Sequence, residues 1–188
     1  MPGAGSERPM RADAKRNYER IVATAKDLFT AHGADVPLDD VAKKAGVGAG
    51  TLYRHFPTRE KLFEAVYRDE IAVLADRAFE LHDELPPWEA LEAWLLAQVT
   101  WVVERHKLAT ILKESIDSGS ETFQYCQKRL REATGLLVET AQDAGLVRPD
   151  VVGADVLRLG HGAGMAVRNC SQEDGKRVLA VILDGLRA

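Results

Sequence analysis

The sequence lacks the features that would mark a membrane or secreted protein. No run of about 18 apolar residues occurs in the chain, so no segment is long enough to cross a bilayer as a helix. The N-terminal stretch M-P-G-A-G-S-E-R-P-M-R has no apolar core and does not resemble a secretion signal. The two cysteines, Cys126 and Cys170, show no Cys-X-X-Cys spacing, which favours reduced thiols over a disulfide. These absences predict a cytoplasmic protein without a membrane partner.

The sequence also lacks the alternation of apolar and polar residues that is typical of β-strands, and it has no internal repeat or low-complexity tract. Its hydrophobic residues make up 46% of the chain and are mainly aliphatic or alanine. They recur at spacings of three and four, as on one face of a helix. A chain of 188 residues can bury a real core in one or two domains, so we predict an all-α fold.

The chain lacks a net positive charge, since its formal net charge is −4. This value argues weakly against a nucleic-acid partner, but the charge is unevenly distributed. Residues 1–68 carry 12 Lys and Arg against 9 Asp and Glu, whereas residues 69–188 carry 13 against 20. The net charges are therefore +3 and −7, and the positive end is where nucleic acid is expected to bind.

The most informative stretch is L-D-D-V-A-K-K-A-G-V-G-A-G-T-L-Y-R-H-F, residues 38–56. It predicts two short helices, Leu38–Ala45 and Ala49–Phe56, separated by Gly46, which suits the left-handed end of a helix. Leu52 and Phe56 give the second helix an apolar side at i, i+4. Its outward residues are then small, polar or cationic: Ala49, Gly50, Thr51, Arg54 and His55. A short helix with this surface suits insertion into the DNA major groove.

The order A-G-V-x-x-G-T-L-Y-x-H-F-x-T-R-E-x-L, residues 45–62, resembles the DNA-binding signature of the TetR family of transcriptional repressors. The resemblance implies an all-helical homodimer that binds a double-stranded operator and is released by a small-molecule effector. It implies neither an enzyme nor a cofactor. The sequence departs from the family pattern at Pro37, where a threonine is usual, and at Gly48, where a serine is usual. Each departure removes a side chain that normally caps a helix.

The resemblance and the outward face together predict the DNA contacts. By resemblance, Tyr53 and His55 reach phosphates, and Arg59 replaces a phosphate-binding lysine. Arg54 suits a phosphate or a guanine edge, while Ala49 and Gly50 permit close approach or contact with a thymine methyl group. The full predicted set is Ala49, Gly50, Thr51, Tyr53, Arg54, His55, Arg59, Arg11 and Arg16. The alternative makes Tyr53 a core aromatic and His55 an ordinary surface histidine.

The chain divides into three predicted parts. Residues 1–13 form a flexible arm, which either follows the minor groove through Arg11 and Arg16 or is a plain disordered tail. Residues 14–66 form a three-helix head with the helix-turn-helix, and residues 67–188 form a helical bundle for ligand binding and dimerisation. A long helix from Thr58 is expected to join head and body as one rod. The later helices are expected at 88–107, 108–118, 121–144, 155–169 and 172–187.

The first body helix carries a stripe of large residues at helical spacing: Leu91, Trp94, Leu95, Gln98, Trp101 and Val102. Such a stripe is commonly plain core. Gln98 is the exception within it, because a buried amide needs hydrogen-bond partners. The alternative is a cavity for a mostly apolar ligand with Gln98 as its polar anchor. The residues expected to line this cavity are Phe79, Trp94, Gln98, Trp101, Ile111 and Phe123.

The last two helices are predicted to pair two copies of the chain. The helix containing G-H-G-A-G, residues 160–164, has glycines that favour close approach by another helix. By family resemblance, the last two helices form the four-helix bundle of the dimer. The predicted interface is Leu157, His161, Gly164, Met165, Leu179, Ile182, Leu183 and Leu186. The alternative is packing within one chain. His161 has no second ligand at metal spacing, so we expect no metal site.

An enzyme is the weaker interpretation. The segments G-V-G-A-G-T and G-H-G-A-G resemble phosphate-binding loops, but neither follows a strand and neither continues to Gly-Lys. No histidine has a serine or cysteine partner at a recognisable spacing. The sequence therefore predicts a TetR-type regulator, and the alternative is a helical small-molecule-binding protein that recognises no specific operator.

Overall fold

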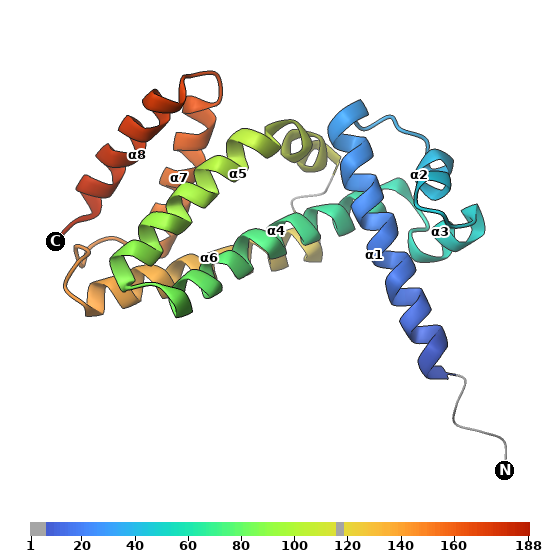
Figure 1. Cartoon of the computed structure of the whole chain (residues 1–188), viewed down its shortest axis with the longest axis horizontal. Coiled ribbons are helices and arrows are strands. Elements are labelled where there is room, and N and C mark those ends of the chain that lie inside the picture. Colours follow the sequence, from blue (N-terminus) through green and yellow to red (C-terminus); the bar gives the residue numbers. More distant parts are fainter. Residues whose placement is uncertain (1–6, 116–118) are drawn as a thin grey trace, which may run out of the picture.

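The computed structural model describes residues 7–115 and 119–188, without the side chains of 7–11, 106, 107, 109 and 111–115. This part of the chain forms eight helices and no strand, apart from one isolated antiparallel bridge between Val147 and Arg187 (Figure 1). The helices are α1 (Glu7–His32), α2 (Leu38–Lys44), α3 (Ala49–His55), α4 (Arg59–Glu84), α5 (Pro87–Ser115), α6 (Glu121–Asp143), α7 (Gly153–Val167) and α8 (Gln172–Leu186). The all-α prediction is confirmed.

Helices α1, α2 and α3 and the start of α4 form a small head at one end of the molecule (Figure 1). Its core is fully apolar and includes Ile21, Phe29, Val41, Leu52 and Phe63. The turn between α2 and α3 is possible because Gly46 adopts φ +66°, a conformation that side chains disfavour. The predicted helix-turn-helix is therefore present, with its glycine in the expected conformation.

Helix α1 begins at Glu7, seven residues earlier than predicted. The prediction of a flexible arm over residues 1–13 is thus wrong for 7–13, and residues 1–6 lie outside the described part. The N-terminal end of α1 extends beyond the other helices of the head (Figure 1). Its side chains from Ala12 to Arg16 are all exposed, so no tertiary burial marks this part of the helix in the sequence.

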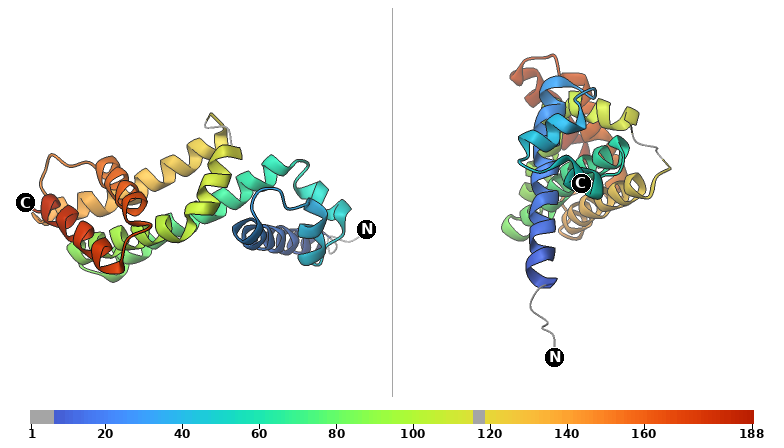
Figure 2. Two further views of the ribbon diagram at one scale, coloured as in Figure 1. Left: turned by 90° about the horizontal axis from the view of Figure 1, so that it is seen from above. Right: turned by 90° about the vertical axis from the view of Figure 1, so that its right-hand side faces the viewer.

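Helix α4 joins the head to the body without interruption, as predicted (Figure 2). Thr58 caps its start, because its side chain accepts a hydrogen bond from the backbone N–H of Lys61 at 3.4 Å. Buried residues continue at helical spacing from Leu62 to Leu81. The same helix therefore packs against α1 in the head and against α5 and α6 in the body, so a displacement of its body end reaches the head.

Helix α5 is one helix of 29 residues rather than the two that were predicted. The prediction of a break between Lys107 and Leu108 is wrong, and two features explain why the helix continues. Residues 100–115 contain no glycine or proline, and Leu108 is buried and extends the apolar stripe. Pro87 occupies the first helical position, where its missing N–H costs no hydrogen bond.

Helix α7 lies between α5 and α6, and α8 covers α7 at the far end of the body (Figure 2). Helix α7 approaches α5 closely at two glycines. A Cβ added at Gly160 would lie 2.1 Å from Oε1 of Gln98, and one added at Gly164 would lie 2.5 Å from Cβ of Val102. The close approach predicted from these glycines is therefore present, and it occurs within one chain, against α5.

Candidate functional site

Helix α3 presents the face that the sequence predicts. Leu52 and Phe56 are 0% and 2% exposed and anchor α3 on the head. The small, polar and cationic residues occupy the other side: Ala49, Gly50, Tyr53 and Arg54 are exposed, and Thr51 and His55 are half-buried. Because Tyr53 is exposed, the alternative that places it in the core is wrong.

The starts of α2 and α3 lack side-chain caps. Pro37 and Gly48 are the N-cap residues, and neither has a side-chain hydrogen bond to the helix. This agrees with the two departures from the family pattern. A Cβ added at Gly50 would meet no other atom within 4 Å, so the first turn of α3 offers its backbone to a partner. Such an open helix start suits close approach to a phosphate or a base edge.

Arg59 is bound within the head. Its guanidinium donates a hydrogen bond to the carbonyl oxygen of Ala34 and so ties the start of α4 to the turn after α1. Any phosphate contact by Arg59 must use its remaining N–H groups, because the guanidinium has five. The structure thus gives Arg59 a structural role that the sequence did not reveal.

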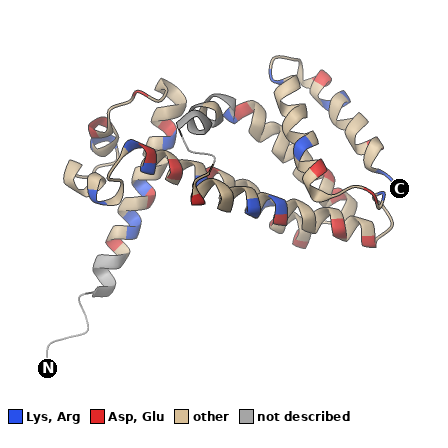
Figure 3. Ribbon diagram, turned by 180° about the vertical axis from the view of Figure 1, so that it is seen from behind, with Lys and Arg blue, Asp and Glu red and all other residues tan. Residues whose placement is uncertain are grey.

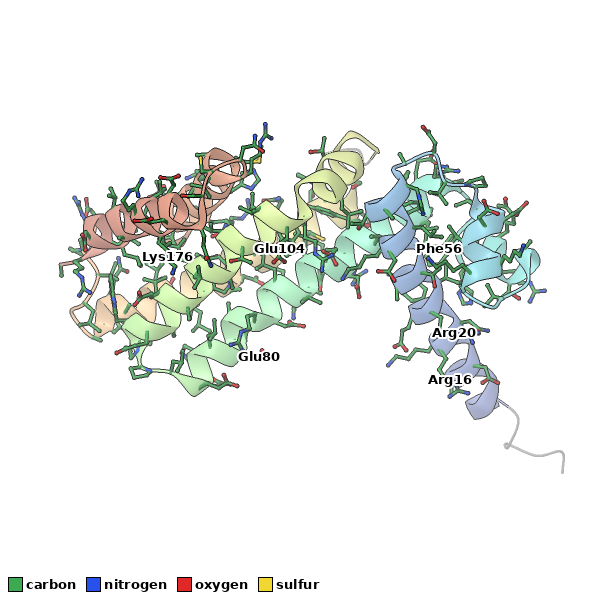
Figure 4. The ribbon with its side chains drawn as sticks, turned by 45° about the horizontal axis from the view of Figure 1, so that its top comes forward. Arg16, Arg20, Phe56, Glu80, Glu104 and Lys176 are labelled. Carbon is green, nitrogen blue, oxygen red and sulfur yellow. The ribbon has the colours of Figure 1, made fainter. Side chains whose placement is uncertain are left out.

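His55 is held in place by an aromatic neighbour. The ring of Tyr18 on α1 lies 6.1 Å from the ring of His55 and 5.1 Å from that of Phe56. Burial raises the pKa of Tyr18, so its phenol stays protonated at neutral pH. These contacts fix α3 against α1, and Figure 4 shows Phe56 between the two helices.

Cationic and acidic residues alternate along α1 on the head (Figure 3). Arg16 pairs with Asp13, and Arg20 donates to Asn17 at 2.7 Å; both arginines are exposed on α1 (Figure 4). Arg54 is exposed, and within the described residues it forms no hydrogen bond or ion pair. Its guanidinium is therefore the most available one for a phosphate or guanine. The side chain of Arg11 lies outside the described residues.

A cavity of about 320 Å³ lies in the body between helices α4, α5, α6 and α7. Its lining is Leu74, Gln98, Trp101, Val102, Gln127, Leu130, Arg131, Ala154, Leu157, Arg158 and His161. Of the six residues expected to line a cavity, Gln98 and Trp101 lie in this wall. This volume is at the lower end of the range for small-molecule sites.

The other predicted pocket residues lie elsewhere. Trp94 is buried away from the cavity, and its Nε1 donates to the carbonyl oxygen of Leu74 at 3.4 Å. Phe79 packs under Arg129, with 5.8 Å from the guanidinium to the ring centroid, and Phe123 stacks on Tyr67 at 5.9 Å. The side chain of Ile111 is outside the described residues. Three of the predicted aromatics are therefore core or surface residues.

Gln98 anchors α7 to α5. It is 2% exposed, and its Nε2 donates to the carbonyl oxygen of Leu157 at 2.8 Å. Its Oε1 has no hydrogen-bond partner among the described residues and lies against Gly160. The predicted need of a buried amide for partners is thus half satisfied within the chain.

The polar residues of the cavity were missed, although their spacing was visible. Gln127 and Arg131 are i, i+4 on α6, and Arg158 and His161 are i, i+3 on α7, so each pair shares a helix face. On α7 that face also carries Leu157. Leu157 and His161, which were expected at the dimer interface, therefore line the cavity.

Most of the remaining predicted interface is buried within one chain. Gly164, Leu179, Leu183 and Leu186 are buried against neighbouring helices of the same chain, as the alternative of internal packing expects, and their place at a dimer interface stays a prediction. Met165 and Ile182 are half-buried. Exposed apolar or small residues recur at three- and four-residue spacing on both helices: Leu159, Gly162 and Ala166 on α7, and Val178, Val181 and Gly185 on α8. We call this set the outer face.

The described residues include no cluster of three or more metal-ligating side chains. Nor does any helix of this part of the chain have the length and apolar character needed to cross a membrane.

The chain is similar to known proteins in both its head and its body. Residues 21–66 match the bacterial regulatory proteins of the tetR family, and residues 86–188 match the C-terminal domain of SbtR-like transcriptional regulators. A TetR transcriptional regulator of Streptomyces coelicolor is 36% identical, with a TM-score of 0.72 over 90% of this chain and 98% of that one. A TetR regulatory protein of Mycobacterium vanbaalenii is 36% identical, with a TM-score of 0.74 over 96% and 100%.

An exposed recognition helix on a three-helix head, joined to a helical body with a cavity, defines a helix-turn-helix transcriptional regulator. The chain belongs to the TetR family. A helix-turn-helix regulator of Staphylococcus aureus, strain MRSA252, is 32% identical over 122 residues. That match covers 63% of this chain and 56% of the staphylococcal protein. All three of these relatives are described as regulators of transcription.

Proposed function

We propose that the protein is a cytoplasmic repressor that binds a pseudo-palindromic DNA operator as a homodimer and is released by a small ligand. The observation that carries this proposal is the exposed face of α3, held by two buried anchors, Leu52 and Phe56. Each α3 enters the major groove of one half-site. The two recognition helices then lie about 34–36 Å apart, one helical turn of the duplex.

Release follows from the position of the cavity. Leu74 of α4 is part of the cavity wall, and α4 continues into the head. Helix α6 also holds α4 near the head, because Oγ1 of Thr122 donates to Glu64 at 3.1 Å. A ligand that shifts α4 changes the spacing of the two heads, which is a population shift between two conformations. DNA and ligand then weaken each other's binding by the same factor.

The Arg54→Gln variant tests DNA binding. We expect a slope of log affinity against log salt that is smaller by about 1 for each subunit, because one phosphate contact is lost. If Arg54 instead contacts a guanine, affinity for the selected operator falls while binding to unrelated duplex is unchanged. The operator is first selected from random duplexes, and binding is measured by fluorescence anisotropy over a salt series.

Arg177→Gln is the control. Arg177 lies on α8, at the opposite end of the molecule from the head, and its replacement removes the same charge. An Arg54 variant that matches the Arg177 variant in slope and specificity would remove α3 from the interface. Uniform weak binding of all duplexes by the unaltered protein would instead favour the alternative, a helical ligand-binding protein without a specific operator.

The outer face is the proposed dimer contact. Val181 is 72% exposed, and its neighbours on α7 and α8 are small or aliphatic. Two copies that join these faces form a four-helix bundle from α7, α8 and their partners, with the heads pointing the same way. The small residues Gly162 and Ala166 allow the helices of the two copies to approach closely.

Val181→Asp is expected to weaken the dimer by about a hundredfold, because a carboxylate buried at an apolar contact has no partner. Analytical ultracentrifugation measures the dissociation constant. Val73→Asp is the matched control, since Val73 is also an exposed valine, 61% accessible, but lies on α4. A Val181 variant that stays as dimeric as the Val73 variant would place the dimer contact on another surface.

A further inference from the structure

The cavity of the body has a charge opposite to that of the body itself. Its lining includes Arg131, Arg158 and His161 and contains no Asp or Glu. By contrast, residues 69–188 as a whole carry a net charge of −7. Basic groups without acidic ones in one hollow of an acidic domain raise the local concentration of anions.

The polarity of the cavity changes with depth. Its apolar residues Leu74, Val102 and Leu130 are buried and form the floor. The arginines and the histidine are exposed and form the mouth. The arrangement thus matches a molecule with an apolar body and one anionic end.

The two arginines differ in the hydrogen bonds and ion pairs that they form within the chain. Arg158 donates to the carboxylate of Asp155 at 3.0 Å, so part of its guanidinium is already engaged. Arg131 forms no hydrogen bond or ion pair with the residues that the structure describes. Because a guanidinium has five N–H groups in a planar fork, each arginine has N–H groups left for a carboxylate.

We propose that the ligand of this cavity is an apolar carboxylic acid bound as its carboxylate, with the carbon skeleton on the floor and the carboxylate between Arg131 and Arg158. This inference rests on the proposed function, because it names the chemical class of the releasing ligand. It also replaces the mostly apolar ligand that the sequence predicted. Gln127 of α6 and Trp101 of α5 line the remaining wall beside the carbon skeleton.

The test compares decanoate, decanol and decylamine on the free dimer, below their critical micelle concentrations. These probes share a ten-carbon chain and differ in end-group charge. Binding is measured by the change in tryptophan fluorescence, to which Trp101 in the cavity wall contributes, and by calorimetry. Decanoate is expected to bind about tenfold more tightly than decanol, a modest factor because the arginines are exposed, and added salt should reduce only this preference.

The charge contacts are tested with the double variant Arg131→Gln/Arg158→Gln. It is expected to lose the preference for decanoate while it binds decanol unchanged. Arg177→Gln is the matched control, since Arg177 is also an exposed arginine paired with the aspartate three residues before it. Equal binding of decanoate and decanol to the unaltered protein, tighter binding of decylamine, or no binding of any probe would overturn the inference.

Operator binding is measured separately with and without decanoate. Carboxylate binding that leaves operator affinity unchanged keeps the ligand class and overturns the release mechanism alone. Specific operator binding together with a cavity that prefers decanol supports the proposed function and overturns the proposal that the ligand is a carboxylate.

Discussion

Replacing Gly164 by alanine is expected to lower the free energy of unfolding by about 1–3 kcal/mol, although alanine is the better helix former. The added Cβ would lie 2.5 Å from Cβ of Val102 and 3.2 Å from the carbonyl oxygen of Val99. Neither atom sits at the end of a flexible side chain, so α7 must move away from α5. Denaturant unfolding, followed by circular dichroism, measures the loss.

Gly162 provides the control within the same helix. A Cβ added there meets no other atom within 4 Å, so Gly162→Ala is expected to keep or raise stability by up to about 1 kcal/mol. Both variants are compared at a protein concentration below the dissociation constant of the dimer, so that the monomer is measured, since Gly162 lies on the outer face. Equal stability of the two variants would show that α7 does not approach α5 this closely.

The neighbouring glycine allows a second measurement. A Cβ added at Gly160 would lie 2.1 Å from Oε1 of Gln98 and 2.8 Å from Cδ1 of Leu95, both in side chains that can move. Gly160→Ala is therefore expected to cost less in the Gln98→Ala background than alone. The difference between the two costs, a double-mutant cycle, measures the contact between α5 and α7.

These glycines also show what the sequence can and cannot predict. A helix that contains Gly160 and Gly164 predicts a close neighbour, because glycine without such a contact only weakens the helix. The pattern does not identify the neighbour. The last two helices were expected to pack together in the dimer, whereas Val102 on α5 of the same chain meets Gly164. Periodicity gives the buried face of a helix, and only the tertiary fold gives its partner.

The head was predicted more completely because its determinants are local. Gly46 ends α2, Thr58 caps α4, and Leu52 and Phe56 fix the orientation of α3, all within 13 residues. The cavity depends on side chains from four helices spread between Leu74 and His161. No spacing in the sequence brings Arg131 and Arg158 to one opening, so its charge became evident only in the fold.

One buried carboxylate lies at the boundary between head and body. Glu70 of α4 is 3% exposed and pairs with Lys26 of α1 and with Arg105 of α5, whose Nε lies 3.5 Å from Oε2. A charge this buried is tolerated only when it is paired, and here the two cations come from the head and the body. One side chain thus joins three helices across the boundary that a ligand signal must cross.

Glu70→Gln is expected to destabilise the protein by about 2–3 kcal/mol, because two partly buried cations lose their counter-charge. The lost stability is expected to weaken the contact between the head and the body. All three tryptophans lie on α5, so their fluorescence reports the body, whereas circular dichroism reports every helix. In the Glu70 variant, unfolding of the head is expected to precede that of the body, and the two signals should separate.

Glu80→Gln is the matched control on the same helix. Glu80 is exposed and pairs with Arg77 at 3.0 Å, so its loss should cost at most about 1 kcal/mol and leave the two signals coincident. If Glu70→Gln behaves like Glu80→Gln, the buried cluster does not hold the head to the body. If it costs more and the signals still coincide, the cluster stabilises the whole chain as one cooperative unit. Separate transitions identify Glu70 as the residue that couples head and body.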